Sequence, residues 1–156
     1  AMQLSIKQIT QNKEEWMPLL LLADPDEGMV KKYLDRGLML GAFGDGQPAG
    51  VIVAVPLQEP GQWEIKNMAV APRYWRRGIG TLLIEEIENC LPPDTDTLWV
   101  GTGDTSTGPL AFYESCGFHF DHVLENFFVE HYPEPIIEDG KQCVDMYYLK
   151  KEPGKW

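Results

Sequence analysis

The chain has 156 residues, 44% of them hydrophobic, and its 24 acidic and 13 basic residues give a formal net charge of −11. This length suits a single domain spanning residues 1–156 that buries roughly two thirds of its unfolded surface. The acidic balance argues against nucleic acid as a partner, and no apolar stretch reaches the ~20 residues that a membrane span needs. The three cysteines show no C-x-x-C pairing, which indicates reduced thiols and a cytoplasmic protein.

The first half of the chain is predicted to contain four strands and two helices. Apolar and polar residues alternate in the first segment, two helical segments follow, and Gly37 ends the second of them. An Asp-Gly turn at residues 45–46 then predicts a hairpin. The predicted strands are Gln3–Thr10, Leu38–Phe43, Ala49–Leu57 and Gln62–Val70, and the predicted helices are Lys13–Leu22 and Pro25–Arg36.

The second half continues with a long amphipathic helix and three strands. The predicted helices are Ile79–Leu91 and Pro109–Cys116, the predicted strands are Thr97–Gly101, His119–Val129 and Cys143–Lys150, and a proline-rich excursion covers Tyr132–Gly140. The element order is therefore β-α-α-β-β-β-α-β-α-β-β. Mixed antiparallel hairpins with one crossover helix fit an α/β (α+β) fold rather than a doubly wound sheet.

The start of the helix at residue 79 has no predicted cap. Residues 72–80 contain no Ser, Thr, Asp or Asn that could accept from its first backbone N–H groups. Two earlier helix starts carry such residues: Asn12 precedes Glu15 by three positions, and Asp24 precedes Pro25. Free N–H groups beside glycines and arginines form an anion site, so we expect a ligand that carries phosphate.

Two better-known phosphate loops do not fit this segment. The dinucleotide fingerprint G-x-G-x-x-G requires glycine where the chain has Leu83, and the G-K-[ST] of a Walker A loop is absent. An ordinary strand–turn–helix connection with a solvated basic turn remains the alternative to a phosphate site.

The segment Trp75-Arg76-Arg77-Gly78-Ile79-Gly80, which follows Val70-Ala71-Pro72, resembles the pyrophosphate loop of the GNAT N-acetyltransferase superfamily, whose pattern is [Q/R]-x-x-G-x-[G/A]. Trp75 departs from this pattern, because Gln or Arg is usual at its position. That departure affects one side-chain contact more than the site as a whole, because the family binds the pyrophosphate mainly through backbone N–H groups.

A second segment, residues 110–118, resembles the family's A-x-x-[F/L]-Y-E-x-x-G-F helix in slightly compressed form. The Asn that often stands upstream of this helix is missing, and Asp104 or Ser106 is the candidate substitute. The two motifs cover roughly residues 38–120. The resemblance implies a GNAT-like, mostly antiparallel central sheet of about six or seven strands with a splayed centre, flanked by about four helices.

The resemblance also implies acetyl-CoA as co-substrate, and it assigns coenzyme-binding roles to specific residues. The backbone of the strand Gln62–Val70 would pair with pantetheine, and the following helix start would hold the pyrophosphate. The implied coenzyme-binding residues are Met68, Val70, Arg76, Arg77, Gly78, Gly80, Thr81 and Ser106.

Two residues are candidates for catalysis. Tyr113 would act as general acid toward the leaving thiolate, because a phenol keeps its proton at neutral pH. Glu64 would act as base, and strict alternation along the strand places it on the face of Met68 and Val70. The structural alternatives are that Tyr113 is a core aromatic residue and that Glu64 is a solvent-facing carboxylate.

The predicted function is direct acetyl transfer to a primary amine of a small, cationic acceptor. The acidic composition favours a cation, and the carboxylates expected nearest to it are those of Glu64, Glu125, Glu130 and Glu134. No metal is expected, because alternation places His119 and His122 on opposite faces of a strand. A homodimer is left open. The alternative function is a non-catalytic acyl-CoA-binding module for sensing or interaction.

Overall fold

The computed structural model describes residues 2–105 and 107–153. The chain divides into two compact units, residues 1–95 and 96–156, hereafter unit 1 and unit 2. Seven longer strands are present among the described residues, four in unit 1 and three in unit 2, and neighbouring strands within each unit run antiparallel. The predicted mixed, mostly antiparallel architecture is therefore confirmed.

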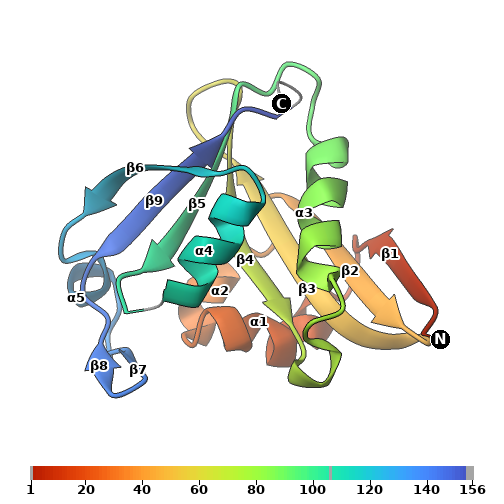
Figure 1. The fold of residues 1–156 in the computed structure, drawn as a ribbon, viewed down its shortest axis with the longest axis horizontal. Coiled ribbons are helices and arrows are strands. Elements are labelled where there is room, and N and C mark those ends of the chain that lie inside the picture. The colour runs from red at the N-terminus through yellow and green to blue at the C-terminus, as the bar shows by residue number, and fades with distance from the viewer. Residues whose placement is uncertain (1, 106, 154–156) are drawn as a thin grey trace. The chain divides into compact units, whose positions relative to one another are not determined.

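Unit 1 contains a four-stranded sheet in the order β1-β2-β3-β4 (Figure 1). The strands are β1 (Leu4–Gln8), β2 (Leu38–Gly44), β3 (Gln47–Pro56) and β4 (Gln62–Val70). Both residues of the β2–β3 turn are left-handed, with φ of 49° at Asp45 and 82° at Gly46. Such a turn matches the twist of the strands that it joins, which is why the Asp-Gly signal predicted this hairpin correctly.

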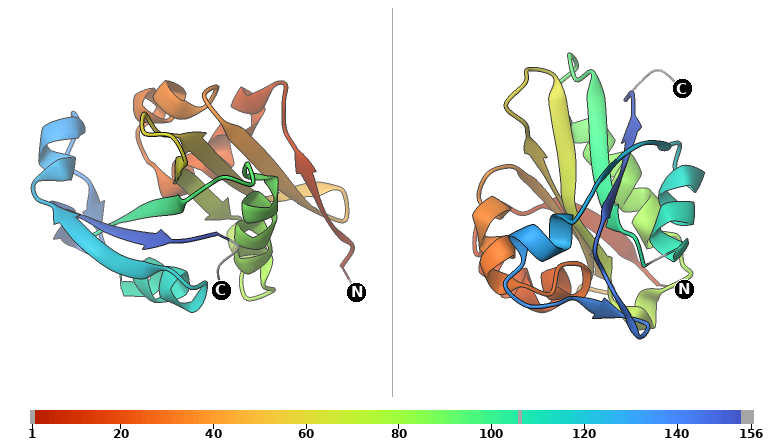
Figure 2. Two further views of the ribbon diagram at one scale, coloured as in Figure 1. Left: turned by 90° about the horizontal axis from the view of Figure 1, so that it is seen from above. Right: turned by 90° about the vertical axis from the view of Figure 1, so that its left-hand side faces the viewer.

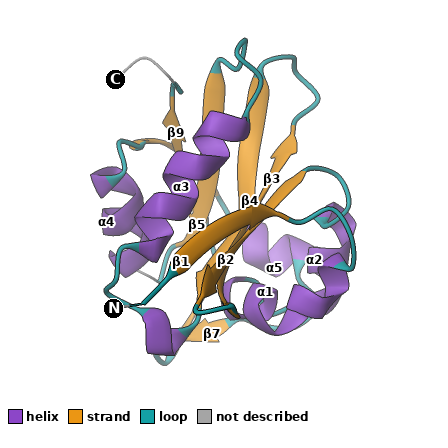
Figure 3. Cartoon of the chain, turned by 90° about the vertical axis from the view of Figure 1, so that its right-hand side faces the viewer, coloured by secondary structure: helices purple, strands orange, loops and turns teal. Residues whose placement is uncertain are grey.

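Helices cover both faces of the sheet in unit 1 (Figures 2 and 3). On one face lie η1 (Lys13–Trp16), α1 (Met17–Ala23) and α2 (Glu27–Tyr33), and on the other lies α3 (Ile79–Cys90). The α1/α2 face buries side chains that include Trp16, Leu20, Val51, Val53 and Val55. Alternation along β3 turns Gly50 to the opposite face, where an added Cβ would lie 3.2 Å from Leu83.

The helix caps differ in part from the prediction. Asp26, not Asp24, caps α2, because its carboxylate accepts from the Met29 N–H at 2.9 Å. The Asp24 carboxylate instead accepts from the Tyr33 hydroxyl at 3.1 Å. Asn12 is left-handed, and its side chain makes no cap hydrogen bond. Of the two helix starts that were predicted to be capped, only that of α2 has a side-chain cap. The capping residue is Asp26 instead of the predicted Asp24.

Unit 2 contains three strands in the order β5-β9-β6, namely β5 (Thr97–Gly103), β9 (Met146–Lys151) and β6 (His119–Leu124). Its helices are α4 (Thr107–Ser115) and α5 (Phe127–His131), and a small hairpin joins β7 (Ile137–Glu138) to β8 (Lys141–Gln142). The predicted strand His119–Val129 is too long, because left-handed Asn126, with φ of 58°, ends the extended chain and α5 follows.

The histidines of β6 correct a second prediction. The register along β9 shifts between Phe120 and His122, so that one extra residue, Asp121, bulges from the strand. His119 therefore pairs with Lys150 and His122 with Tyr148, two β9 residues that share a face. The two histidines lie on the same face, not on opposite faces as strict alternation predicted.

Candidate active site

The loop after β4 places an uncapped helix start beside cationic side chains. Gly78 precedes α3 with φ of 76°, and no side chain caps the helix. The first intrahelical bond runs from the Leu82 N–H to the Gly78 carbonyl at 3.1 Å, so the N–H groups of residues 79–81 have no partner within the helix. A Cβ added at Gly78 would meet no atom within 4 Å, so a ligand can approach the backbone here.

The arginines of this loop are available to an anion. Arg73, Arg76 and Arg77 are exposed, and within the described part of the chain none of them takes part in a salt bridge. Arg73 and Arg77 lie 5.0 and 5.9 Å from the centroid of the Tyr74 ring. Arg76 is left-handed, with φ of 64°. The predicted residues Arg76, Arg77, Gly78, Gly80 and Thr81 are therefore brought together at one helix start.

Backbone groups of β4 point alternately toward β3 and away from it. The Ala71 N–H donates to the Ala49 carbonyl at 2.8 Å, and Gly50 pairs with Val70. By the alternation of an antiparallel ladder, the N–H and C=O groups of Met68 and Val70 point away from β3. The Val70 carbonyl accepts the indole N–H of Trp75 at 2.7 Å. The Val70 carbonyl thus already has one partner.

A bulge in β4 moves Glu64 to the other face. Val53 pairs with Asn67 but Ala54 pairs with Ile65, so Lys66 is an extra residue. Glu64 consequently pairs with Val55 and lies on the α1/α2 face. Met68 pairs with Ile52 and lies on the α3 face. The prediction that Glu64 shares a face with Met68 and Val70 is wrong, because strict alternation does not hold across a bulge.

Glu64 is buried rather than solvent-facing, at 8% exposure, and its carboxylate lies 3.4 Å from the Lys66 ammonium. The same face of β4 carries Asn67, at 3% exposure, which the sequence did not single out. Asn67 Nδ2 donates to the Leu20 carbonyl at 2.9 Å and to the Tyr33 hydroxyl at 3.0 Å. Burial raises the pKa of Tyr33, so its phenol stays neutral. The sequence gives no clear signal for Asn67, because it is one of four polar residues among the nine of β4.

Tyr113 is packed at the C-terminal end of α4, with 7% of its surface exposed. Its ring meets those of Phe112 and Phe118 edge-on at 5.3 and 5.7 Å. The Phe118 N–H donates to the Tyr113 carbonyl, and left-handed Gly117 donates to the Glu114 carbonyl, both at 3.0 Å. These two bonds form a Schellman motif and explain why glycine and phenylalanine follow the helix. Burial raises the pKa of Tyr113, so the phenol keeps its proton.

Asp104 and Ser106 are the candidates to replace the Asn that is usual upstream of α4 in the family. Ser106 lies outside the described residues. Both carboxylate oxygens of Asp104 accept backbone N–H groups, from Val144 and Asp145, at 3.1 Å each. Asp104 therefore holds the segment that leads into β9.

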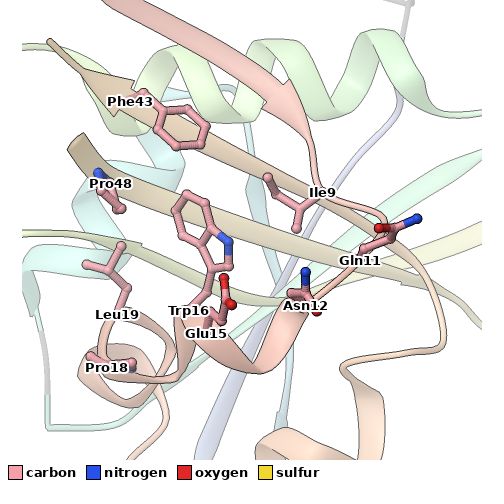
Figure 4. Close-up of a pocket in the computed structure, with 9 residues that line it drawn as sticks. All are labelled: Ile9, Gln11, Asn12, Glu15, Trp16, Pro18, Leu19, Phe43 and Pro48. Atoms are coloured by element: carbon pink, nitrogen blue, oxygen red, sulfur yellow. The ribbon is translucent and has the colours of Figure 1, made fainter. Parts of the chain in front are cut away.

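A pocket in unit 1 contains none of the predicted site residues (Figure 4). It has a volume of about 480 Å³, and Trp16 and Phe43 meet edge-on at 5.3 Å in its wall. The described residues contain no group of three or more His, Cys, Asp or Glu that could hold a metal ion. No helix formed by those residues is long and apolar enough to cross a membrane.

Comparison with known proteins identifies the family of the chain. Residues 8–118 match the acetyltransferase (GNAT) family. The chain belongs to the GNAT acetyltransferase family. The curated relative "Uncharacterized N-acetyltransferase YvbK" of Bacillus subtilis is 37% identical over 148 residues, which are 94% of this chain and 95% of the relative.

Two solved GNAT structures contain the coenzyme. An Elizabethkingia anophelis GNAT acetyltransferase with acetyl-CoA bound is 35% identical, with a TM-score of 0.89 over 96% of this chain and 97% of that protein. A Bacillus subtilis acetyltransferase in complex with CoA is 36% identical, with a TM-score of 0.84 over 96% of this chain and 99% of that protein. The predicted family, fold class and acetyltransferase activity are thereby confirmed.

Proposed function

We propose that the chain transfers an acetyl group directly from acetyl-CoA to a primary amine of a small cationic acceptor. The observation that carries this proposal is the uncapped start of α3, where free backbone N–H groups lie beside three arginines without salt bridges among the described residues. A helix start of this kind favours a phosphate-bearing ligand, and two close GNAT relatives contain such a ligand.

The coenzyme would be bound through three kinds of group. The backbone of Gly78, Gly80 and Thr81, with the Arg76 and Arg77 side chains, would hold the pyrophosphate. The outward backbone groups of Met68, together with the Val70 N–H, would pair with the amides of pantetheine as a neighbouring strand does. Ser106 is proposed as a further contact by family resemblance.

Three proton transfers accompany the reaction. An alkyl ammonium with a pKa near 10 needs about 4 kcal/mol to lose its proton at pH 7. In our proposal Glu64, directly or through water, takes this proton. The amine nitrogen then bonds to the acetyl carbon and loses its second proton to solvent, the C–S bond breaks, and Tyr113 gives its proton to the departing thiolate. Tyr113 regains a proton from solvent. The Met68 N–H is proposed to stabilise the tetrahedral oxyanion.

A cationic acceptor is favoured by charge. The chain carries 24 acidic against 13 basic residues, and the basic cluster is assigned to the pyrophosphate, which leaves the rest of the protein strongly acidic. Glu64 is buried on the sheet face that α1 and α2 cover. Glu125, Glu130 and Glu134 are exposed carboxylates of unit 2 that we propose add to the negative field.

The test is release of coenzyme A thiol from acetyl-CoA across a panel of polyamines, aminoglycosides, amino sugars and peptides with exposed amines. We expect turnover with at least one cationic amine, and a KM for it that rises with salt. Turnover confined to neutral or anionic acceptors would exclude the cationic class. Tight acetyl-CoA binding without turnover on any amine would favour the alternative, a non-catalytic acyl-CoA-binding module.

A further inference from the structure

Trp75 is fixed in place and widely exposed. Its indole N–H donates to the Val70 carbonyl at 2.7 Å, while 61% of its surface is exposed. It stands at the position where the family pattern has Gln or Arg. An aromatic ring left in water forgoes the stabilisation that burial of its apolar surface would give. The hydrogen bond therefore fixes a ring whose apolar surface remains available to a ligand.

The hydrogen bond also decides which part of the ring is presented. The indole N–H is the one donor of this side chain, and Val70 occupies it. The surface left for a partner is thus the apolar ring. Because the Val70 backbone points away from β3, the bond ties the ring to the β4 edge that we assign to pantetheine.

The neighbouring side chains leave this ring uncovered. Arg73 and Arg77 stack on Tyr74 instead, and no ring or cation–π contact of Trp75 is found among the described residues. The next residue, Arg76, begins the loop that leads to the start of α3. Along the chain, Trp75 therefore stands between the β4 edge and the anion site.

We propose that Trp75 contacts the coenzyme, with its ring packed against the end of pantetheine that joins the pyrophosphate. The inference rests on the proposed function. The methylene and gem-dimethyl groups of this segment offer apolar surface to the ring. The Val70 carbonyl, which accepts from Trp75, holds the ring where the proposed strand-like pairing of pantetheine reaches Val70. An apolar contact thus replaces the polar side chain usual in the family.

Binding of acetyl-CoA and of its two halves, S-acetyl-4′-phosphopantetheine and adenosine 3′,5′-bisphosphate, tests this contact by calorimetry. We expect Trp75→Ala to lower the affinity for acetyl-CoA and for the phosphopantetheine half roughly tenfold. Its affinity for the adenosine half should stay within twofold of the parent's. Trp75→Phe, which keeps a ring but loses the bond to Val70, should fall between Trp75→Ala and the parent. The matched control is Leu22→Ala, which truncates another exposed apolar side chain of unit 1 at 56% exposure and should bind all three ligands as the parent does.

A spectroscopic measurement accompanies the titration. Acetyl-CoA should change the intrinsic fluorescence of the parent, and Trp75→Phe should remove most of that change although four other tryptophans remain of the five. Unchanged affinity of Trp75→Ala for acetyl-CoA would overturn the inference, and so would a loss confined to the adenosine half. Failure of the parent itself to bind acetyl-CoA would instead refute the proposed function.

Discussion

Replacing Gly78 by Asp places a carboxylate where the pyrophosphate is proposed to bind. Gly78 has φ of 76° and no atom within 4 Å of an added Cβ, so the new side chain meets no steric clash and points into open space at the start of α3. Two unit charges 4 Å apart repel by about 4 kcal/mol at an effective dielectric constant of 20 and by about 1 kcal/mol in bulk water. An intermediate cost of about 2 kcal/mol corresponds to roughly thirtyfold weaker binding of acetyl-CoA.

The Gly78→Asp substitution also strains the left-handed backbone at this position. A second variant with the same kind of strain serves as the matched control. Gly46, in the β2–β3 turn, has φ of 82° and equally open surroundings. Gly46→Asp therefore introduces the same charge on a left-handed glycine that is not part of the α3 start. Calorimetry should show parent-like affinity for Gly46→Asp, and a defect for Gly78→Asp that shrinks at high salt. Equal affinities of the two variants would refute the assignment of the pyrophosphate to this helix start.

Three further predictions concern catalysis and stability. Tyr113→Phe should lower kcat by roughly 10²-fold, the usual scale for a lost general acid, with the Kd for acetyl-CoA unchanged; full kcat in steady-state assays would remove Tyr113 from the mechanism. Glu64→Gln should depress the rate most below pH 8, where the ammonium must lose its proton, and a pH–rate profile that overlays the parent's would place the base elsewhere. Because burial raises the pKa of Tyr33 and of Tyr113 above the ordinary value of 10.0, the folded state holds these protons more tightly than the unfolded state. The contribution of these two tyrosines to the free energy of unfolding should therefore be constant below pH ~10 and fall above it. A denaturant midpoint that does not change between pH 9 and 11 would contradict that reasoning.

The fold was largely predictable because its signals are local. The Asp45-Gly46 turn, the glycine before α3 and the Gly117-Phe118 end of α4 each determine a backbone conformation through their own residue types. Helical periodicity located α3 to within one residue at its C-terminal end. These elements were predicted without information from distant parts of the chain.

The faces of two strands were not predictable, because a bulge leaves no mark in the sequence. Lys66 in β4 and Asp121 in β6 are extra residues that only the pairing with β3 and β9 reveals. Each bulge reverses the alternation, which moved Glu64 to the α1/α2 face and brought His119 and His122 to one face. The buried bonds of Asn67 depend likewise on Leu20 and Tyr33, which are far away in sequence.

The most direct test of the central claim is mass spectrometry of an amine acceptor after incubation with acetyl-CoA and the purified protein. The acceptor should gain one acetyl group on nitrogen, in equal amount to the coenzyme A thiol released. Tyr113→Phe should slow the formation of both products together. Thiol release without an N-acetylated acceptor, or an acetylated acceptor formed equally fast without the protein, would contradict it.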